Sequence, residues 1–142
     1  MQFNVGDYVG ADRSLTQAYK ILKDQKENEK LFVVFSMMGI VANETKDFNK
    51  ALDYYSKTLK IIKESNLIDD YQEATCLNNI GYVYQNKGDF AEAIKNYKLA
   101  LRDKTILKNQ PELYSLLIDN LAYSKYKFLL PSLSSSPFAK RM

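Results

Sequence analysis

The sequence predicts an all-α protein, built as a solenoid of antiparallel helix hairpins with about six helices in all. Apolar residues recur at helical spacing along most of the chain, and the same pattern returns after about forty residues. Only 5 glycines and 3 prolines interrupt the 142 residues. Recurrence at a fixed period of this size is typical of solenoids, in which each unit buries its apolar side against its neighbours.

The repeat is clearest between residues 46–60, KDFNKALDYYSKTLK, and residues 88–102, GDFAEAIKNYKLALR. The matched positions lie 42 residues apart: Asp47 and Asp89, Phe48 and Phe90, Ala51 and Ala93, Tyr55 and Tyr97, Leu59 and Leu101, and upstream Gly39 and Gly81. A weaker copy at 6–20 precedes the first of these by 40 residues. Residues 117–126 echo residues 76–85 at an offset of 41.

Each unit is expected to contain two helices. In the best-preserved unit the second helix spans 90–101, where apolar residues follow i, i+3, i+4, i+7 spacing. The first helix spans 70–87 and carries an apolar stripe of its own. The two stripes consist of Leu77, Ile80, Gly81 and Tyr84, and of Phe90, Ala93, Ile94, Tyr97, Ala100 and Leu101.

Capping residues mark the ends of these helices. Asp89 is a good N-cap, and Glu92 three residues later completes a capping box. Asp70 and Glu73 offer the same pair to the preceding helix. Gly88 stands where that helix needs a left-handed terminus, a conformation that glycine adopts without steric cost.

Longer breaks between units are expected at 66–69 and 108–111, and Pro111 fits the first turn of the helix that follows. The first element, 7–23, corresponds to the second helix of a unit without its first. The last, 112–128, corresponds to a first helix without its second. The chain therefore begins and ends in the middle of a repeat.

We divide the chain into a helical repeat domain, residues 1–128, and a C-terminal tail, residues 129–142. The tail, LLPSLSSSPFAKRM, contains two prolines and a serine cluster and has no helical period. A solenoid normally has a polar cap on each open end. We therefore expect a fragment of a longer protein, or a truncated product whose tail or partner covers the open end.

Small residues predict where the two helices of a hairpin touch. Gly81 and Ala93 are twelve residues apart, and Gly39 and Ala51 repeat this spacing. Two antiparallel helices approach closely only where a side chain is small, so each pair is expected to form the contact, with aromatic residues filling the space beside it. The expected contacts are made by Gly39, Ala51, Tyr55, Gly81, Ala93 and Tyr97.

The chain resembles a tetratricopeptide repeat protein over residues 6–128. The resemblance rests on Leu77-x2-Ile80-Gly81-x2-Tyr84 followed by Ala93-x3-Tyr97 and Ala100, and on Phe35, Met38, Gly39, Ala51 and Tyr55 of the earlier unit. Leucine replaces the family's tryptophan. Ala42 stands where the family has tyrosine, and Thr58 where it has alanine.

The resemblance implies a right-handed superhelix of stacked hairpins. The repeat is longer than the family's usual length of about 34 residues, so longer helices are expected. Long repeats of this kind are similar to those of bacterial regulatory proteins, including peptide-sensing regulators and sensor kinases.

The composition argues against catalysis. There is no histidine, so the commonest general base and metal ligand is missing. Cys76, the single cysteine, lies beside a helix stripe and is interpreted as a packing residue. The serines at 132 and 134–136 have no base nearby in the sequence. We expect no enzyme activity, no metal and no cofactor.

In the family that the chain resembles, the first helices of the units line a concave surface that binds a peptide or a partner's helix. Asn79 and Asn120 occupy matching places, and a row of amides can bond a peptide backbone. Alternatively, these asparagines only bond neighbouring helices. The candidate groove residues are Ser36, Ile40, Asn43, Asn78, Asn79, Tyr82, Gln85, Asp119, Asn120, Tyr123 and Tyr126.

Two classes of function follow. The first is a module that binds a protein or peptide, as the sensing or scaffolding part of a bacterial regulator. The alternative is a structural segment that forms a homodimer through the open ends of the solenoid. Binding of nucleic acid is not expected, because the net charge is only +3 and the lysines are scattered.

No apolar run reaches the roughly 18 residues of a membrane span, and the N-terminal residues do not read as a signal peptide. The expected location is the cytoplasm, or the periplasm if the chain is excised from a membrane-anchored sensor.

Overall fold

The computed structural model describes residues 5–66, 69 and 71–134, and within them the chain forms helices and no strand. The helices are α1 (Val5–Asp24), α2 (Asn28–Glu44), α3 (Phe48–Glu64), α4 (Tyr71–Lys87), α5 (Phe90–Ala100), α6 (Ile106–Asn109) and α7 (Pro111–Ser134). Six are long and α6 is a single turn, so the prediction of an all-α protein with about six helices is confirmed.

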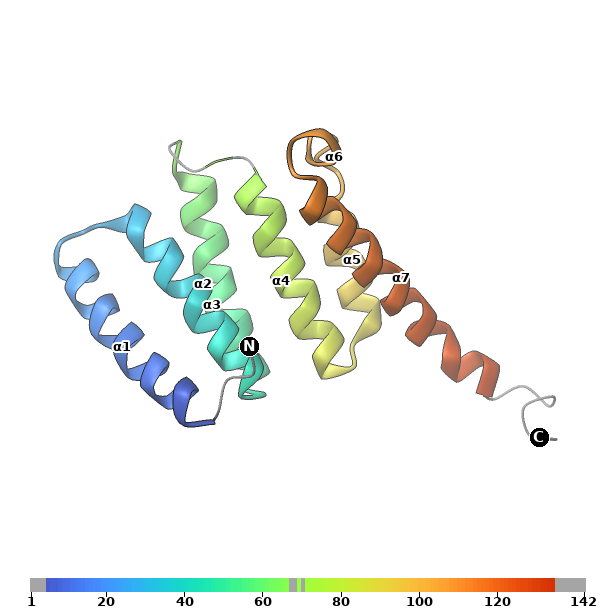
Figure 1. The fold of residues 1–142 in the computed structure, drawn as a ribbon, viewed down its shortest axis with the longest axis horizontal. Coiled ribbons are helices and arrows are strands. Elements are labelled where there is room, and N and C mark those ends of the chain that lie inside the picture. Colours follow the sequence, from blue (N-terminus) through green and yellow to red (C-terminus); the bar gives the residue numbers. More distant parts are fainter. Residues whose placement is uncertain (1–4, 67–68, 70, 135–142) are drawn as a thin grey trace.

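The helices stack as antiparallel hairpins. α2 pairs with α3, and α4 pairs with α5, and these two hairpins make the most extensive contacts in the molecule. Figure 1 shows α3 and α5 behind α2 and α4, with α1 at one edge of the array and α7 at the other. α1 packs against α2, and α7 packs against α5 and more lightly against α4. The half-units predicted at the two ends are thus α1 and α7.

Two stretches differ from the sequence-based expectation. α7 continues to Ser134, whereas the predicted helix ended at 128 and residues 129–134 were assigned to the tail. Pro131 lies inside the helix. A proline removes its own N–H from the hydrogen-bond ladder and its ring crowds the carbonyl four residues earlier, so a helix is expected to kink or end there. α7 nevertheless continues to Ser134. Residues 135–142 of the predicted tail lie outside the described residues.

The second difference concerns the break predicted at 108–111. α5 is 11 residues long, against 17 for its counterpart α3. The residues by which this unit exceeds the family's usual repeat of about 34 form a turn and α6. The longer second helix that the repeat length predicted is therefore not present in this unit. Asp103 stabilises the turn, because its Oδ1 accepts hydrogen bonds from the N–H of Thr105 at 2.9 Å and from its hydroxyl at 2.7 Å. Pro111 is the first residue of α7, as predicted.

The turn between α4 and α5 has the predicted chemistry. Gly88 has a φ of +87°, its N–H donates to the carbonyl of Gln85, and the N–H of Asp89 donates to that of Tyr84. This pair of bonds is the Schellman motif. Lys46 and Lys26 take the same left-handed conformation, with φ of 64° and 55°, at the two earlier turns.

The N-cap predicted at Asp89 is present, since its Oδ1 accepts from the N–H of Glu92 at 3.2 Å. Asp47 caps α3 in the same way through the N–H of Lys50. The capping box is only half formed, because the N–H of Asp89 is used in the Schellman motif. Asp70, the cap predicted for α4, lies outside the described residues.

Each hairpin is held closed by a tyrosine that packs on a glycine. A Cβ added at Gly81 would lie 2.5 Å from Cε1 of Tyr97, and one added at Gly39 would lie 2.7 Å from Cε1 of Tyr55. The three atoms nearest to each glycine's Cβ position all belong to the tyrosine ring. The closest partner of the glycine is therefore this ring, where the sequence analysis expected Ala51 or Ala93. Both alanines are fully buried.

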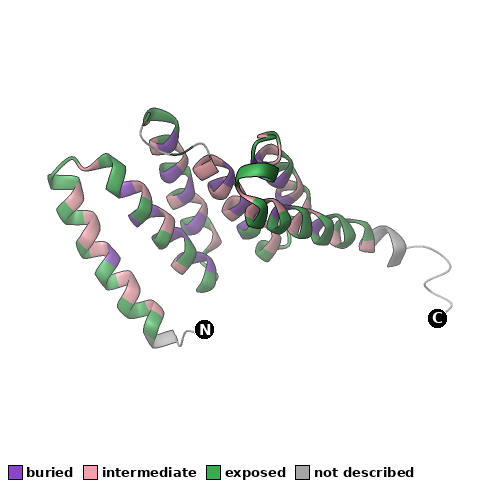
Figure 2. Cartoon of the chain, turned by 45° about the horizontal axis from the view of Figure 1, so that its top comes forward, coloured by how far each residue is buried: buried purple, intermediate pink, exposed green. Residues whose placement is uncertain are grey.

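The buried residues form three adjoining clusters rather than one central core. The first joins α1 to α2, the second joins α2 and α3 to α4, and the third joins α4 and α5 to α6 and α7. In Figure 2 the buried residues accordingly face inward between neighbouring helices, while green exposed residues follow the outer sides. Each hairpin depends on its neighbours for burial, which is how a solenoid is stabilised.

Candidate functional site

The first helix of the first complete unit, α2, carries an exposed apolar stripe. On α2, Val33, Met37 and Ile40 are spaced by one helical turn and are each about half exposed, at 46%, 49% and 48%. Met38, the next residue after Met37, is buried at 4%. Large apolar side chains that stay in water over successive turns of one helix commonly mark a surface for a partner.

A groove of about 280 Å³ lies between this stripe and α4. We call it the α2–α4 groove. Its floor includes Thr58, Ile62 and Cys76, and its two walls come from α2 and α4. The wall residues are Phe32, Val33, Ser36, Met37 and Ile40 on α2, and Gln72, Thr75 and Asn79 on α4. The α2 wall is mainly apolar and the α4 wall is polar.

Three of the predicted groove residues, Ser36, Ile40 and Asn79, line this groove. The hydroxyl of Ser36 donates to the carbonyl of Phe32 at 2.8 Å, within its own helix. Asn79 is half-buried and lines the groove from the α4 wall.

Other predicted groove residues bond neighbouring helices. Asn120 on α7 donates from Nδ2 to Oδ1 of Asn78 on α4 at 3.0 Å, and Asn78 is buried. Asn86 on α4 donates to Oδ1 of the buried Asn43 on α2 at 3.1 Å. These amide pairs connect the first helix of one unit to the first helix of the next. Asn120 thus bonds a neighbouring helix, which was the alternative stated for it, and Asn43 and Asn78 do the same.

Gln85 also acts between helices. Its Oε1 accepts from the hydroxyl of Tyr97 at 3.0 Å and from that of Ser124 at 3.1 Å. It therefore joins α4 to α5 and to α7. Burial, with a smaller contribution from Tyr82, raises the pKa of Tyr97 above its ordinary value, so this hydroxyl stays protonated as a donor.

The remaining predicted groove residues are exposed: Tyr82, Asp119, Tyr123 and Tyr126. The ring of Tyr123 lies 6.4 Å from that of Phe90, edge to face, and Nζ of Lys127 lies 5.7 Å from its centroid. Tyr126 is more exposed, at 59%. These tyrosines do not line the α2–α4 groove.

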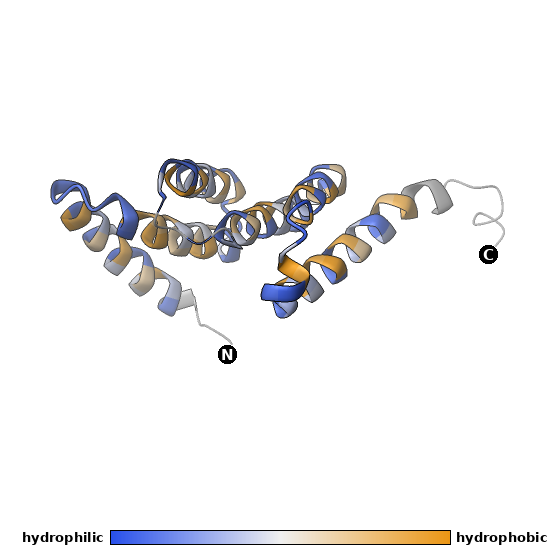
Figure 3. Ribbon diagram, turned by 90° about the horizontal axis from the view of Figure 1, so that it is seen from above, coloured by the Kyte–Doolittle hydropathy of each residue, from blue (hydrophilic) through white to orange (hydrophobic). Residues whose placement is uncertain are grey.

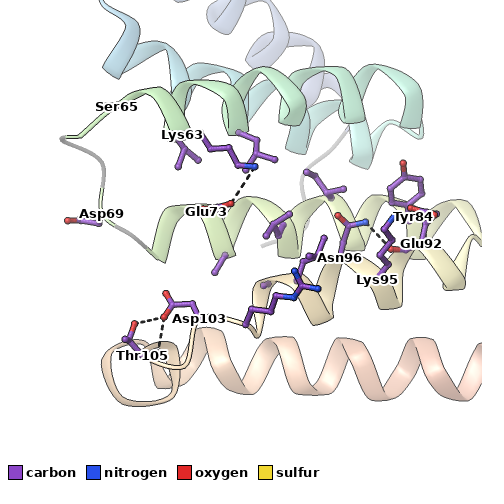
Figure 4. A pocket seen from close by; sticks show the side chains of 18 residues that line it. Lys63, Ser65, Asp69, Glu73, Tyr84, Glu92, Lys95, Asn96, Asp103 and Thr105 are labelled. Carbon is purple, nitrogen blue, oxygen red and sulfur yellow. Dashed lines mark hydrogen bonds and ion pairs between the residues drawn. The ribbon is translucent and has the colours of Figure 1, made fainter.

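A second and larger cavity, about 1070 Å³, was not expected from the sequence. It lies between α3, α4 and α5, and Figure 4 shows the Lys63–Glu73 ion pair, 3.7 Å long, at one side and Asp103 with Thr105 at another. Charges of both signs surround an apolar floor that includes Leu59, Leu77 and Leu99. The long connections on either side of α4–α5 were the one sequence signal for this opening.

Cys76, the single cysteine, is a packing residue in the described structure. Cys76 is buried, its Sγ donates to the carbonyl of Tyr55 at 3.5 Å, and burial, followed by the nearby Glu73, raises the pKa of its thiol to about 12. A thiol with so high a pKa is a poor nucleophile at neutral pH. No group of three His, Cys, Asp or Glu side chains able to hold a metal occurs within the described residues.

None of the helices in the described part of the chain has both the length and the apolar character to cross a membrane.

Comparison with known proteins gives a family and a set of distant relatives. Photosystem I assembly protein Ycf3 of Prochlorococcus marinus strain NATL2A is 33% identical over 95 residues, which cover 64% of this chain and 51% of the relative. The same protein from the pastoris subspecies is 30% identical over 77 residues, covering 54% and 42%. The chain spans about half the length of the curated relatives it matches. No solved structure matches it.

The family model described as "Tetratricopeptide repeat" matches residues 30–105, which run from α2 to the turn before α6. This range holds both hairpins except the first two residues of α2, and it includes both glycine–tyrosine contacts and the α2–α4 groove. The fold of stacked hairpins, the repeat in the sequence and this match agree, and the chain belongs to the tetratricopeptide repeat family, whose domains mediate protein–protein interaction.

Proposed function

We propose that this chain is a non-catalytic module that binds a peptide or protein segment in the α2–α4 groove. The observation that carries the proposal is the half-exposed stripe of Val33, Met37 and Ile40 beside a groove of about 280 Å³. Covering such a stripe removes apolar surface from water, and complete burial of one side chain of this size contributes about 1.5–3 kcal/mol.

The two walls of the groove suit different parts of a ligand. An apolar side chain of the ligand packs on the α2 wall, against Met37 and Ile40. Gln72 and Asn79 on the α4 wall carry amides, which both donate and accept hydrogen bonds and therefore suit a peptide backbone. The expected ligand is a segment with apolar side chains on one side, either extended or helical.

A scaffolding or sensing role in a larger bacterial regulatory protein is the setting we infer for this module. The absence of histidine from the sequence and the buried, protonated Cys76 favour binding over catalysis. The relatives are named as assembly proteins, which supports a scaffolding role for this chain as well.

Selection from a library of random linear peptides tests the proposal. Peptides selected on the chain should lose about tenfold or more in affinity for Met37→Asp, because the aspartate removes an apolar contact and adds a charge that binding must desolvate. Leu107→Asp is the matched control: it changes a residue that is 58% exposed on α6, outside the groove. If the selected peptides bind both variants as tightly as the unchanged chain, their binding site lies outside the α2–α4 groove and the proposal is refuted.

Self-association is the second candidate function, and the exposed apolar residues of α7 favour it. Leu116, Tyr126, Phe128 and Leu129 are each 47% or more exposed on this helix. Large apolar side chains that stay exposed along one helix are candidates for contact with a partner.

A further inference from the structure

The cavity of about 1070 Å³ between α3, α4 and α5, which we call the α3–α5 cavity, corresponds to a place where the preceding unit has a stack of aromatic rings. There the ring of Phe35 on α2 pairs with those of Tyr19 on α1 and Tyr54 on α3, at 5.5 Å and 6.3 Å between centroids. Nζ of Lys57 lies 5.8 Å from the Phe35 ring and 5.7 Å from the Tyr54 ring. Three rings and a lysine thus pack between α1, α2 and α3.

The repeat changes all four of these side chains at the α3–α5 cavity. The counterparts, at an offset of 40 for the first and 42 for the others, are Leu59 for Tyr19, Leu77 for Phe35, Asn96 for Tyr54 and Leu99 for Lys57. All four line the cavity, and none carries a ring. Figure 3 shows α3 and α5 on the same side of α4, and the cavity lies between them. It is therefore found where the rings of the preceding unit are missing.

The ion pair beside the aromatic stack is also changed. In the preceding unit, Nζ of Lys57 lies 2.9 Å from Oδ2 of Asp53. The offset of 42 places Leu99 and Lys95 at these two positions, so a cation stands where the preceding unit has a carboxylate. Arg102, three residues after Leu99, lines the cavity as well. Neither Lys95 nor Arg102 forms an ion pair with a described residue.

The carboxylates around the cavity leave these two cations available to a ligand. Four carboxylates of the described residues line the cavity. Glu73 pairs with Lys63, and Asp103 accepts the hydrogen bonds of the turn after α5. Asp69 and Glu92 lie at opposite ends of the cavity in Figure 4. A carboxylate that enters near the middle therefore meets two cations, which is complementary in charge.

Asn96 adds a hydrogen-bond acceptor at the position of the Tyr54 ring. It is only 9% exposed, and its Nδ2 donates to the carbonyl of Glu92 at 2.9 Å. Its Oδ1 accepts no hydrogen bond from the described residues. The hydroxyl of a tyrosine can donate to this oxygen, whereas phenylalanine has no donor. The cavity therefore suits tyrosine better than phenylalanine.

We propose that the α3–α5 cavity binds a segment of a partner protein in which a tyrosine stands beside an aspartate or glutamate. The tyrosine ring packs on the apolar floor, and its hydroxyl donates to Oδ1 of Asn96. The neighbouring carboxylate lies between Lys95 and Arg102. The partner thus supplies the ring and the carboxylate that the preceding unit supplies from its own chain. Tyrosine is one of the residues that most often anchor a protein interface.

A library of peptides with a fixed central tyrosine and random neighbours, selected on the Met37→Asp variant, tests the proposal. This variant has lost an apolar contact of the α2–α4 groove, and the two sites share only Ile62, so each proposal can fail without the other. The selected peptides should carry aspartate or glutamate beside the tyrosine. Replacing the tyrosine with phenylalanine should weaken binding about fivefold, and replacing it with alanine about tenfold or more. Failure to select such acidic peptides would overturn the proposal.

Two lysines of α5 provide a matched pair of variants. Lys95 and Lys98 are both exposed, and only Lys95 lines the cavity. Lys95→Glu should weaken binding of the selected peptides about tenfold or more, and Lys98→Glu by less than about threefold. A peptide with lysine in place of its acidic residue should regain affinity for Lys95→Glu. Equal losses in the two variants would show a general effect of charge and would overturn the proposal.

Rebuilding the aromatic stack tests where the ring binds. The double variant Leu77→Phe, Asn96→Tyr carries the two rings of the preceding unit at the matching positions and should fill the cavity. It should no longer bind the tyrosine peptides, while peptides selected for the α2–α4 groove still bind. Circular dichroism establishes that it is folded, and the lysine variants decide the question if it is not. A folded double variant that binds the tyrosine peptides undiminished would refute the assignment.

Discussion

The contact between Gly81 and Tyr97 makes the hairpin of α4 and α5 sensitive to a single methyl group. Gly81→Ala places a Cβ 2.5 Å from Cε1, 2.8 Å from Cδ1 and 3.0 Å from Cζ of the Tyr97 ring. Ordinary contacts between carbon atoms begin near 3.5 Å. The ring would therefore have to move by about 1 Å, yet it is fully buried and its hydroxyl is bonded to Gln85.

Helix propensity and overpacking change the free energy of unfolding of Gly81→Ala in opposite directions. Alanine is favoured over glycine inside a helix by about 1 kcal/mol. Overpacking a buried site costs about 1–3 kcal/mol, and loss of the Tyr97–Gln85 hydrogen bond adds about 1 kcal/mol. We expect Gly81→Ala to lower the free energy of unfolding by about 1–3 kcal/mol, with Gly39→Ala behaving similarly against Tyr55.

Urea denaturation followed by circular dichroism measures the change. Gly10→Ala is the matched control, because this helical glycine is exposed and has nothing within 4 Å of its Cβ position. It should gain stability from helix propensity alone, by about 1 kcal/mol. A Gly81→Ala variant as stable as the unchanged chain would refute the account of how the hairpin is packed.

The left-handed Lys46, with φ of 64°, gives an opposite prediction: Lys46→Gly should raise the free energy of unfolding by about 1 kcal/mol in the same urea assay. An unchanged urea midpoint would show that the lysine is not strained there. Burial raises the pKa of Cys76 from 9.0 to about 12 and raises that of Tyr55 as well. Stability should therefore be complete below pH 9 and fall as the pH approaches 12, because the unfolded chain loses these protons first. A urea midpoint that does not fall by pH 11 would contradict this linkage.

Local signals in the sequence were sufficient to predict the hairpins. Asp47, Asp89 and Gly88 act within one turn of the chain, so their type and spacing place the start of α3, the start of α5 and the end of α4. The repeat then indicated that similar units stack. The length of α7 and the presence of α6 were missed because proline and the Asp103 turn leave more than one local conformation open.

Contacts between units could not be predicted in the same way. Asn78 and Asn120 are 42 residues apart, and their amides meet only when one hairpin is seated on the next. The sequence around an asparagine beside an apolar stripe is the same whether its side chain faces a ligand or a neighbouring helix. Val33 and Met37, which lie beside Ile40 on the exposed α2 wall, were absent from the predicted groove, in which Ile40 was the one aliphatic residue.

The most direct test of the binding groove uses two adjacent methionines. Met37 is 49% exposed on the α2 wall, and Met38 is 4% exposed inside the molecule. With the methionine methyl groups labelled with carbon-13, addition of a selected peptide should shift the NMR signal of Met37 strongly and that of Met38 only slightly. A bound peptide that leaves the Met37 signal unmoved would contradict the assignment of the α2–α4 groove as the binding site.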